Sequence, residues 1–107
     1  MPELSRGGRS KAAGIMKTIP MGKPDKNQGE IIQALRKVGA LVIVVSAFAV
    51  GFDLIVIFRG VIHLAEVKQP GEDLTEKEAK MQTALAEHGV KMRIWHSVLS
   101  TFEDVLG

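Results

Sequence analysis

The sequence predicts an all-α membrane protein built around one long transmembrane helix. Three observations lead to this fold class. Residues 39–58 form a block of twenty with a single charged side chain. The 107-residue chain is 46% hydrophobic, and its apolar excess lies in that block. Basic residues dominate before the block, whereas acidic residues outnumber basic ones after it.

Composition sets further limits. A chain of this length supports one domain at most. The absence of cysteine excludes disulfides, thiolate metal sites, iron–sulfur clusters and cysteine nucleophiles. A net charge of +2 is too small to imply a nucleic-acid partner, and we expect none.

Residues 1–26 are predicted to form a flexible, disordered basic tail. They hold four Gly and three Pro, with six Lys or Arg against two acidic residues. Their periodic apolar surface is too small to offset the entropy of ordering. We expect this tail to be attracted to anionic lipid headgroups, although SRGGRSK also resembles an RNA-binding segment.

Residues 27–67 are predicted to form the transmembrane helix with its juxtamembrane extensions. Ile31, Ile32 and Leu35 recur at helical spacing. At 1.5 Å per residue the apolar block spans about 30 Å, the hydrocarbon thickness of a bilayer. Arg36 and Lys37 before it and Arg59 after it would meet lipid headgroups.

Two alternatives compete with a membrane span. The many β-branched residues also suit a buried helix or a central strand, and residues 47–49 resemble a signal-peptide cleavage site. The apolar side chains contribute enough insertion free energy to outweigh Asp53. We therefore predict residence in a bacterial inner membrane, with the N-terminus cytoplasmic and the C-terminus outside.

Beyond the span we expect a loop and a second helix. Residues 68–74 contain Pro70-Gly71, a strong helix breaker. Residues 75–107 are predicted to form an amphipathic helix that starts near Thr75, with acidic residues in its first turn. Its apolar face is predicted to contact a partner subunit through Ile94, Trp95, Val98, Leu99 and Phe102.

A stripe of small and polar residues along the span is predicted to dock onto another helix. Its members are Gly39, Ser46, Ala49, Asp53 and Gly60. Asp53 lies deep in the apolar block, where an ionisable side chain needs a partner. It would pair with a group of another subunit, stay protonated and hydrogen-bonded within an oligomer, or relay protons.

No combination of residues in the sequence predicts a catalytic or metal-binding site. His63 and Glu66 have a spacing that places two metal ligands on one helix face, but we favour a solvated or headgroup-level polar turn with Arg59 just beyond the membrane. No phosphate-binding glycine loop, serine nucleophile elbow or zinc-protease motif is present. We therefore expect no enzyme activity, catalytic residue, metal or cofactor.

The stretch from residue 31 to residue 75 resembles the first membrane segment of small inner-membrane proteins of type IVB secretion and conjugation systems, the IcmC/DotE group. The resemblance lies in Ala47, Ala49 and Gly51, in Gly60, Val61, Ile62 and Leu64, and in Gly71 and Glu72. It implies a non-enzymatic membrane subunit or a pilin-like part of a transfer machine.

The predicted function is therefore structural. We expect a single-pass subunit that docks by its stripe into a larger membrane complex, such as a secretion, conjugation or energy-transducing assembly, with other membrane subunits as partners. The alternative is a pore former or holin-like protein that makes a homo-oligomer through the same stripe.

Overall fold

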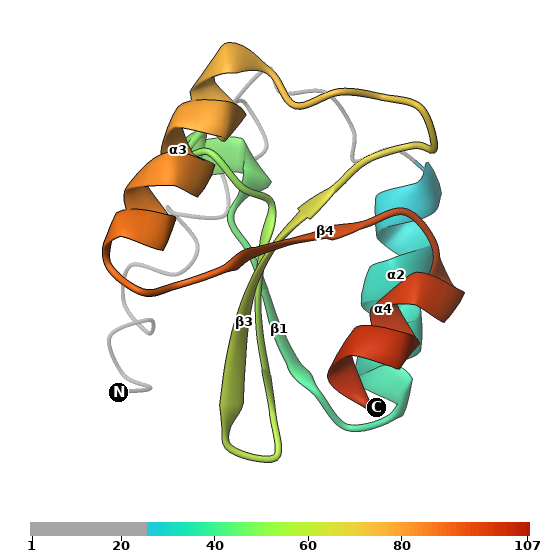
Figure 1. Cartoon of the computed structure of the whole chain (residues 1–107). Helices are drawn as coiled ribbons and strands as arrows, with labels where there is room; N and C mark the ends of the chain where they lie inside the picture. Colours follow the sequence, from blue (N-terminus) through green and yellow to red (C-terminus); the bar gives the residue numbers. More distant parts are fainter. Residues whose placement is uncertain (1–25) are drawn as a thin grey trace, which may run out of the picture.

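The computed structural model describes residues 26–107, which form a four-stranded mixed sheet flanked by helices (Figure 1). The fold is α/β, so the predicted all-α class is wrong. Nearly all of the predicted tail, residues 1–25, lies outside the described part of the chain. The elements in order are α2 (Lys26–Lys37), β1 (Leu41–Val44), the 3₁₀ helix η2 (Ser46–Phe48), β2 (Leu54–Phe58), β3 (Val61–Val67), α3 (Glu76–Glu87), β4 (Met92–Trp95) and α4 (Val98–Val105).

The sheet has the strand order β1-β2-β3-β4. The first three strands form an antiparallel meander, in which Leu54 of β2 pairs with Ala65 of β3. β4 lies parallel to β3 and pairs Trp95 with Val67. Because parallel neighbours need a crossover connection, the chain leaves the sheet after β3 and returns through α3. The carboxyl ends of β3 and β4 therefore lie together.

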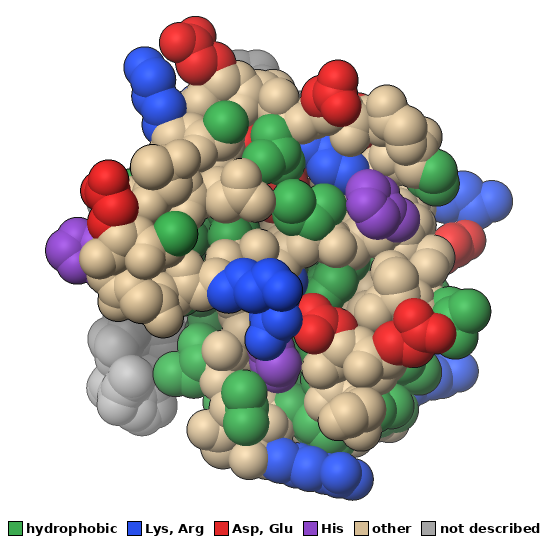
Figure 2. All heavy atoms as spheres, in the orientation of Figure 1, with side chains coloured by type: hydrophobic (Ala, Val, Ile, Leu, Met, Phe, Trp, Pro, Cys, Tyr) green, Lys and Arg blue, Asp and Glu red, His purple; other side chains and the backbone are tan. Residues whose placement is uncertain are grey.

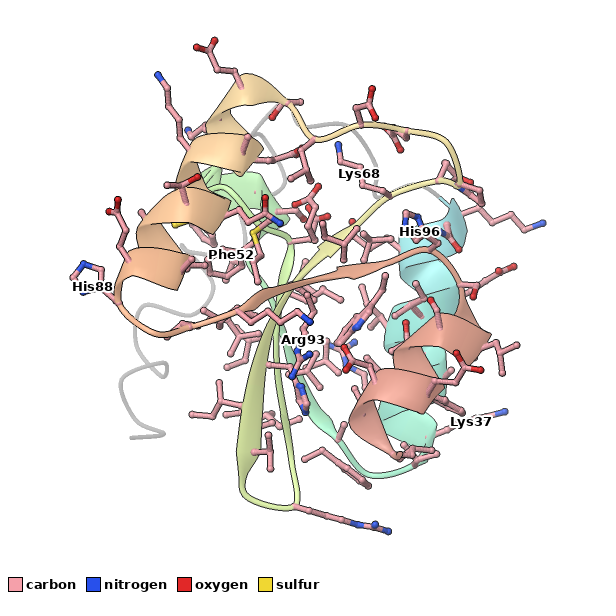
Figure 3. All side chains as sticks on the ribbon, viewed as in Figure 1. Lys37, Phe52, Lys68, His88, Arg93 and His96 are labelled. Carbon is pink, nitrogen blue, oxygen red and sulfur yellow. The ribbon has the colours of Figure 1, made fainter. Side chains whose placement is uncertain are left out.

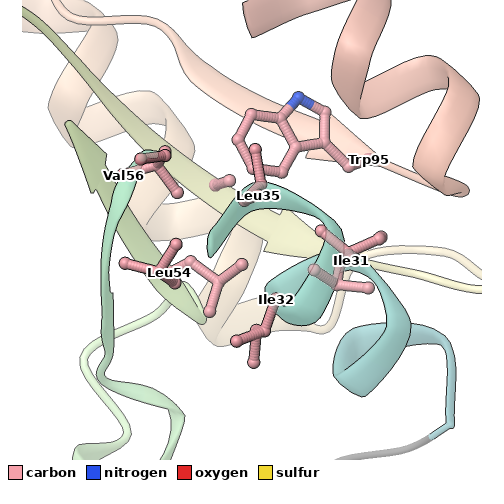
Figure 4. Close-up of a cluster of buried hydrophobic side chains, with 10 residues drawn as sticks. Ile31, Ile32, Leu35, Leu54, Val56 and Trp95 are labelled. Atoms are coloured by element: carbon pink, nitrogen blue, oxygen red, sulfur yellow. The ribbon is translucent and has the colours of Figure 1, made fainter. Parts of the chain in front are cut away.

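Helices lie on both sides of the sheet. α2 and α4 pack side by side on one face, and α3 covers part of the other (Figure 1). The main core lies between the sheet and the α2–α4 layer, and Figure 4 shows its side chains. Its buried members are Ile31, Ile32, Leu35, Ala40, Val42, Leu54, Val56, Ala65, Val67 and Trp95.

Trp95 connects α4 to this core. Its indole is buried, and its Nε1 donates a hydrogen bond of 2.8 Å to Oδ2 of Asp104 in α4. The other oxygen of Asp104 lies 3.3 Å from the Arg93 guanidinium. A buried indole N–H needs an acceptor, and Asp104 provides it from the helix that closes the core.

The apolar block folds as two strands separated by a 3₁₀ turn, not as a spanning helix. α2 ends at Lys37, and Gly39 follows with φ of +95°, in the left-handed region that favours glycine. Eight of the twenty residues in the block are Val or Ile, whose branched side chains pack well in strands. The local preference of the block is for a sheet, and the tertiary structure satisfies it.

A strand pattern was hidden because both faces of β1 and β2 are apolar. Val42 and Val56 point into the core, whereas Leu41 and Ile43 point to the opposite face and stay 56% and 42% exposed. Alternating polarity, the usual signal of a half-buried strand, is therefore missing.

No helix within residues 26–107 is both long enough and apolar enough to cross a bilayer. This finding overturns the predicted single-pass membrane topology. It equally overturns the predicted inner-membrane localisation, with its cytoplasmic N-terminus and external C-terminus.

The C-terminal third is also more divided than predicted. The helix start at Thr75 is confirmed, since Thr75 caps α3 and acidic residues occupy its first turn. The expected amphipathic helix, however, is interrupted by β4 and resumes only as α4. Gly89, with φ of +81°, follows α3 and redirects the chain toward β4.

Candidate functional site

Two carboxylates lie opposite each other where β2 begins and β3 ends. Asp53 immediately precedes β2, and its backbone N–H donates to the carbonyl of Ala65 at 2.9 Å. The Asp53 side chain is hydrogen-bonded to that of Glu66, and both line one cavity with Glu78 of α3. The Asp53 Oδ2 atom also accepts a hydrogen bond of 2.9 Å from the backbone N–H of Val67.

Lys68 adds a cation beside these acids. It follows Glu66 by two residues, so its side chain points to the same face, and that side chain is 7% exposed. Its Nζ lies 2.8 Å from Glu78 Oε1, 3.7 Å from Glu66 Oε2 and 3.8 Å from Glu72 Oε2. Figure 3 shows Lys68 near His96 of the β4–α4 connection, and His96 Nδ1 lies 3.2 Å from the Lys68 carbonyl oxygen.

The first turn of α3 delivers Glu78 to the site. Thr75 and Glu78 form a capping box: the Thr75 hydroxyl accepts from the Glu78 N–H, and Glu78 Oε1 accepts from the Thr75 N–H at 2.8 Å. The same Glu78 oxygen receives the Lys68 ammonium. One carboxylate therefore both starts the helix and holds the lysine.

A small cavity of about 150 Å³ opens onto this cluster. A close approach between α3 and the loop before β2 forms part of its wall. A Cβ atom added at Gly51 would lie 2.7 Å from Cβ of Met81 in α3, and Gly51 has φ of +107°. Only glycine fits there. The cavity is lined by Ser46, Ala49, Gly51, Phe52, Asp53, Glu66, Thr75, Lys77 and Glu78.

Burial and crowding raise the pKa values of two acids in the site. Burial raises the pKa of Glu66 to about 9, helped by its hydrogen bond to Glu78 and by the negative charges of Asp53 and Glu78. Burial also raises the pKa of Asp53, although the Val67 N–H opposes this. The site holds more negative charge than its own lysine neutralises.

In both Lys68 and Glu78, the ion pair between them shifts the pKa in the direction opposite to the shift caused by burial. Burial alone would lower the pKa of Lys68, but the hydrogen bond and charge of Glu78 raise it. Burial alone would raise the pKa of Glu78, but the Lys68 ammonium and the Thr75 N–H lower it. Lys68 therefore stays charged and cannot act as a base near neutral pH.

In the part of the chain that the structure describes, no three His, Cys, Asp or Glu side chains are grouped so as to hold a metal ion. A closed protein cage such as structural zinc requires is therefore not formed by these residues. Mg²⁺ makes a smaller demand, because it keeps several waters and needs only one or two carboxylates together with substrate phosphate oxygens. Asp53 and Glu66 are two carboxylates that line the same cavity.

The structure brings together only part of the predicted docking stripe. Ser46, Ala49 and Asp53 all line the cavity. Gly39 instead follows α2, and Gly60 lies in the β2–β3 turn. These positions are too scattered to form one helix stripe.

The predicted partner face is divided between two elements. Ile94 and Trp95 belong to β4 and point to opposite sides of the sheet. Val98 and Phe102 of α4 pack against the core, and Leu99 is 67% exposed.

The basic residues predicted to meet lipid headgroups have local contacts within the fold. Arg36 donates from its guanidinium to the carbonyl of Val42 at 3.1 Å. Arg59, at the β2–β3 turn, lies 4.8 Å from the centre of the Phe58 ring. Lys37 is exposed at the end of α2.

His63 and Glu66 do not share a face. Both lie on β3, where a separation of three residues places side chains on opposite sides. His63 is buried in the core beside Trp95, and its Nδ1 has no hydrogen-bond partner among the described residues. The i, i+3 pairing expected on a helix is therefore not available on this strand.

Lys68 and Glu78 were not predicted as site residues, and Glu66 was considered only as a partner of His63. The signal was present: an acid precedes one β-branched strand, and Glu-x-Lys ends the next. With strands of period two, Glu66 and Lys68 share a face, and an antiparallel hairpin returns them to Asp53. A helix prediction for residues 39–58 does not bring Asp53 close to Glu66 and Lys68, so their proximity was not predicted.

The chain matches no protein-family model, and neither the curated proteins nor the solved structures yield a match to it. These comparisons say nothing about the resemblance to type IVB secretion subunits, which stays a prediction.

Proposed function

We propose that this chain is a divalent-metal-dependent nuclease that hydrolyses phosphodiester bonds at the Asp53–Glu66 pair. The observation that carries the proposal is the convergence of three side chains. Asp53 and Glu66 line a cavity together with Glu78 of α3, and the Lys68 Nζ lies 3.7 Å from Glu66 Oε2 without lining that cavity itself.

The carboxylates favour a divalent cation. Burial raises the pKa of both Glu66 and Asp53, and the negative charges of Asp53 and Glu78 raise that of Glu66 further. A doubly charged ion would relieve that repulsion and displace the proton. Such an ion lowers the pKa of a bound water and stabilises charge on a phosphoryl oxygen.

Lys68 supplies the complementary charge. A lysine ammonium is a compact point charge that suits a phosphate oxygen. Lys68 stays charged near neutral pH and so is not a proton acceptor, and because it lies outside the cavity lining it would act on a phosphate there only through its charge, across Glu66 and Glu78. Glu78 would hold it in position, since their atoms are 2.8 Å apart.

The size of the cavity favours a polymer over a free nucleotide. Pockets that enclose a small ligand usually measure about 300–1,000 Å³. The cavity of about 150 Å³ accepts one phosphodiester group, while the rest of the substrate stays outside.

The reaction adds one water across a phosphodiester bond. The water oxygen bonds to phosphorus, and the bond from phosphorus to one bridging oxygen breaks. One proton of the water goes to the leaving oxygen and the other to solvent, which leaves a phosphate monoester and a free hydroxyl. No oxidant or second substrate is required.

The proposal departs from the expectation of a non-enzymatic protein without a nucleic-acid partner. That expectation depended on a helix that filled the membrane and left Asp53 without local partners. In the fold, Asp53 faces Glu66, and the helix that would carry the docking stripe is not formed. Docking into a larger assembly stays an untested prediction.

Cleavage of labelled DNA and RNA, single-stranded and duplex, by the full-length chain tests the proposal. We expect products with MgCl₂ or MnCl₂ and none with EDTA. Asp53→Asn, Glu66→Gln and Lys68→Met should each lower the rate by at least about 100-fold. Glu76→Gln is the matched control, because Glu76 is an exposed acid of the same helix turn that pairs with Lys80.

Two results would contradict the proposal. One is no metal-dependent cleavage of any of these substrates by the native chain. The other is equal cleavage by the native chain and all three site variants, which would assign the activity to a contaminant.

A further inference from the structure

His63 is a buried titratable side chain that the proposed site does not use. It lies on β3 opposite Val56 of β2, and its side chain faces the core, where it is 6% exposed. The centre of its ring lies 6.3 Å from that of Trp95. Its Nδ1 has no hydrogen-bond partner among the described residues. Buried polar atoms nearly always have a partner, so this nitrogen is an exception.

The charged groups that act on His63 come from β4 and α4. Burial lowers the pKa of His63, the negative charge of Asp104 opposes this shift, and the positive charge of Arg93 adds to it. The neighbours of His63 on the same face of β3 are Val61 and Ala65. The buried side chains of α2, β1 and β2 are uncharged.

Figure 2 shows this part of the molecule from outside. Basic, acidic and histidine side chains lie near one another at the middle of the face, beside β4 and α4. Figure 3, in the same orientation, labels Arg93 there. The core is therefore closed at this point by a small group of charged side chains.

Both oxygens of Asp104 are already engaged with β4. Oδ2 accepts the hydrogen bond of 2.8 Å from the Trp95 indole, and Oδ1 lies 3.3 Å from the Arg93 guanidinium. Neither oxygen is bonded to His63 in this arrangement. These polar contacts fasten α4 to β4, and the partly buried Val98, Phe102 and Val105 hold the same eight-residue helix against the core.

A proton on His63 would disturb this closure. The imidazolium ion carries an N–H donor on both nitrogens. In the closed fold its Nδ1 proton would be buried without an acceptor, and its charge would be repelled by Arg93. A buried charge without a partner is strongly unfavourable. Relief requires that Asp104 turns from Trp95 and Arg93 toward the imidazolium or that water reaches the ring, and α4 must move for either change.

We infer that His63 is a pH-sensitive switch: when it gains a proton, α4 separates from the sheet and uncovers Trp95. The switch is carried by the juxtaposition of an unpartnered buried imidazole with the Asp104 carboxylate that fastens α4. It does not depend on the proposed nuclease function.

The direction of the pH dependence follows from which state binds the proton better. In the opened state the pKa of His63 returns toward its ordinary value of 6.5, whereas burial keeps the pKa lower in the closed state. The closed state is therefore fully favoured above this value, and opening becomes easier as the pH falls below it. Global stability is a poor measure of this effect, because the raised pKa of Glu66 makes it change in the opposite direction.

Local opening of α4 is measured directly on the full-length chain at pH 7.5 and pH 5.5. Hydrogen exchange of the α4 amides, corrected for its intrinsic pH dependence, gives the opening constant. Acrylamide quenching reports the exposure of Trp95, which is the single Trp of the chain. Together the two measurements distinguish movement of the helix from a change in the indole alone.

We expect the opening constant of the native chain to be about three- to tenfold larger at the lower pH, with a parallel rise in quenching. His63→Gln cannot take up this proton and should show neither change. His63→Leu should behave like His63→Gln, so the comparison remains if one variant does not fold. His88→Gln is the matched control, because His88 is exposed at the end of α3, and it should behave like the native chain.

Two results would overturn the inference. One is an opening constant of the native chain that does not change between the two pH values. The other is the same increase in the native chain and in the His63 variants, which would assign the pH dependence to another group such as Asp104.

An NMR titration of the native chain tests the switch without any substitution. The His63 ring is identified by its nuclear Overhauser effect to the adjacent Trp95 ring. Its pKa should lie below the ordinary value of 6.5, and a pKa at or above that value would also overturn the inference.

Discussion

Glu66 shows how a single side chain links the site to the stability of the fold. Its side chain is 4% exposed and lies among Asp53, Lys68 and Glu78. Burial of a carboxylate beside other carboxylates is unfavourable unless a cation compensates. Without a divalent ion, the molecule compensates by keeping a proton on Glu66.

This proton predicts how stability depends on pH. The pKa of Glu66 is about 9 in the folded chain against 4.5 for the ordinary side chain, so the folded state binds the extra proton between these values. The free energy of unfolding should therefore fall as pH rises through that window. Glu66→Gln cannot titrate and should flatten the fall, which makes the variant more stable than the native chain at pH 8.

Thermal denaturation in EDTA from pH 5 to pH 9 measures this effect. Glu76→Gln should keep the native pH profile, because Glu76 is 85% exposed. If Glu66→Gln had the same pH profile as the native chain, the buried proton on Glu66 would be disproved.

Asp53 was recognised from the sequence, but its surroundings were not. An acid within an apolar run indicates a partner, and that reasoning holds in a sheet as well as in a bilayer. The partners differ from those expected of a membrane subunit, because they come from this chain: the Val67 N–H and the Glu66 carboxyl. Finding them requires the strand register, which a single sequence does not state.

Among the helices and strands, the sequence correctly predicted the start of α3, which depends on residues close together in the chain. The helix start near Thr75 was found because Glu76 and Glu78 in the first turn interact favourably with the helix dipole. The apolar block was misassigned because twenty apolar residues also suit two strands that are apolar on both faces. The β2–β3 turn was missed because it is formed by Arg59-Gly60, with φ of +53° and +80°, instead of the common Asn-Gly.

The contact of Gly51 with α3 leads to a prediction about the packing of elements. Gly51→Ala would place a Cβ atom 2.7 Å from the Met81 Cβ at a positive φ, and we expect it to destabilise the chain by about 2–4 kcal/mol. Gly60→Ala is the control, because it has a positive φ but nothing within 4 Å. It should cost only about 1 kcal/mol.

Urea denaturation of both variants measures the difference. Equal free energies of unfolding for Gly51→Ala and Gly60→Ala would show that backbone conformation alone determines the cost. The close approach of α3 to the cavity wall would then not be rigid.

At the scale of the whole molecule, the acid pair predicts a link between metal binding and folding. An ion that binds only the folded chain stabilises it by about 2.7 kcal/mol at a hundred times its Kd. MgCl₂ should therefore raise the melting temperature of the native chain, and more at pH 8 than at pH 6, because the ion must displace the proton of Glu66.

The double variant D53N/E66Q should lose this response, and NaCl at matched ionic strength should not reproduce it. An equal MgCl₂ shift in the native chain and in the double variant would place the ion elsewhere. Differential scanning fluorimetry on the full-length chain is sufficient for the comparison.

The capping box of α3 has a consequence for how the protein can change. Glu78 secures the first helical turn through Thr75 and anchors the Lys68 ammonium through the same oxygen. A substitution of Glu78 therefore changes both the position of the Lys68 ammonium and the first turn of α3. Two independent requirements therefore restrict which residues can replace Glu78 during evolution. A redesigned site without Glu78 would need another N-cap interaction for α3.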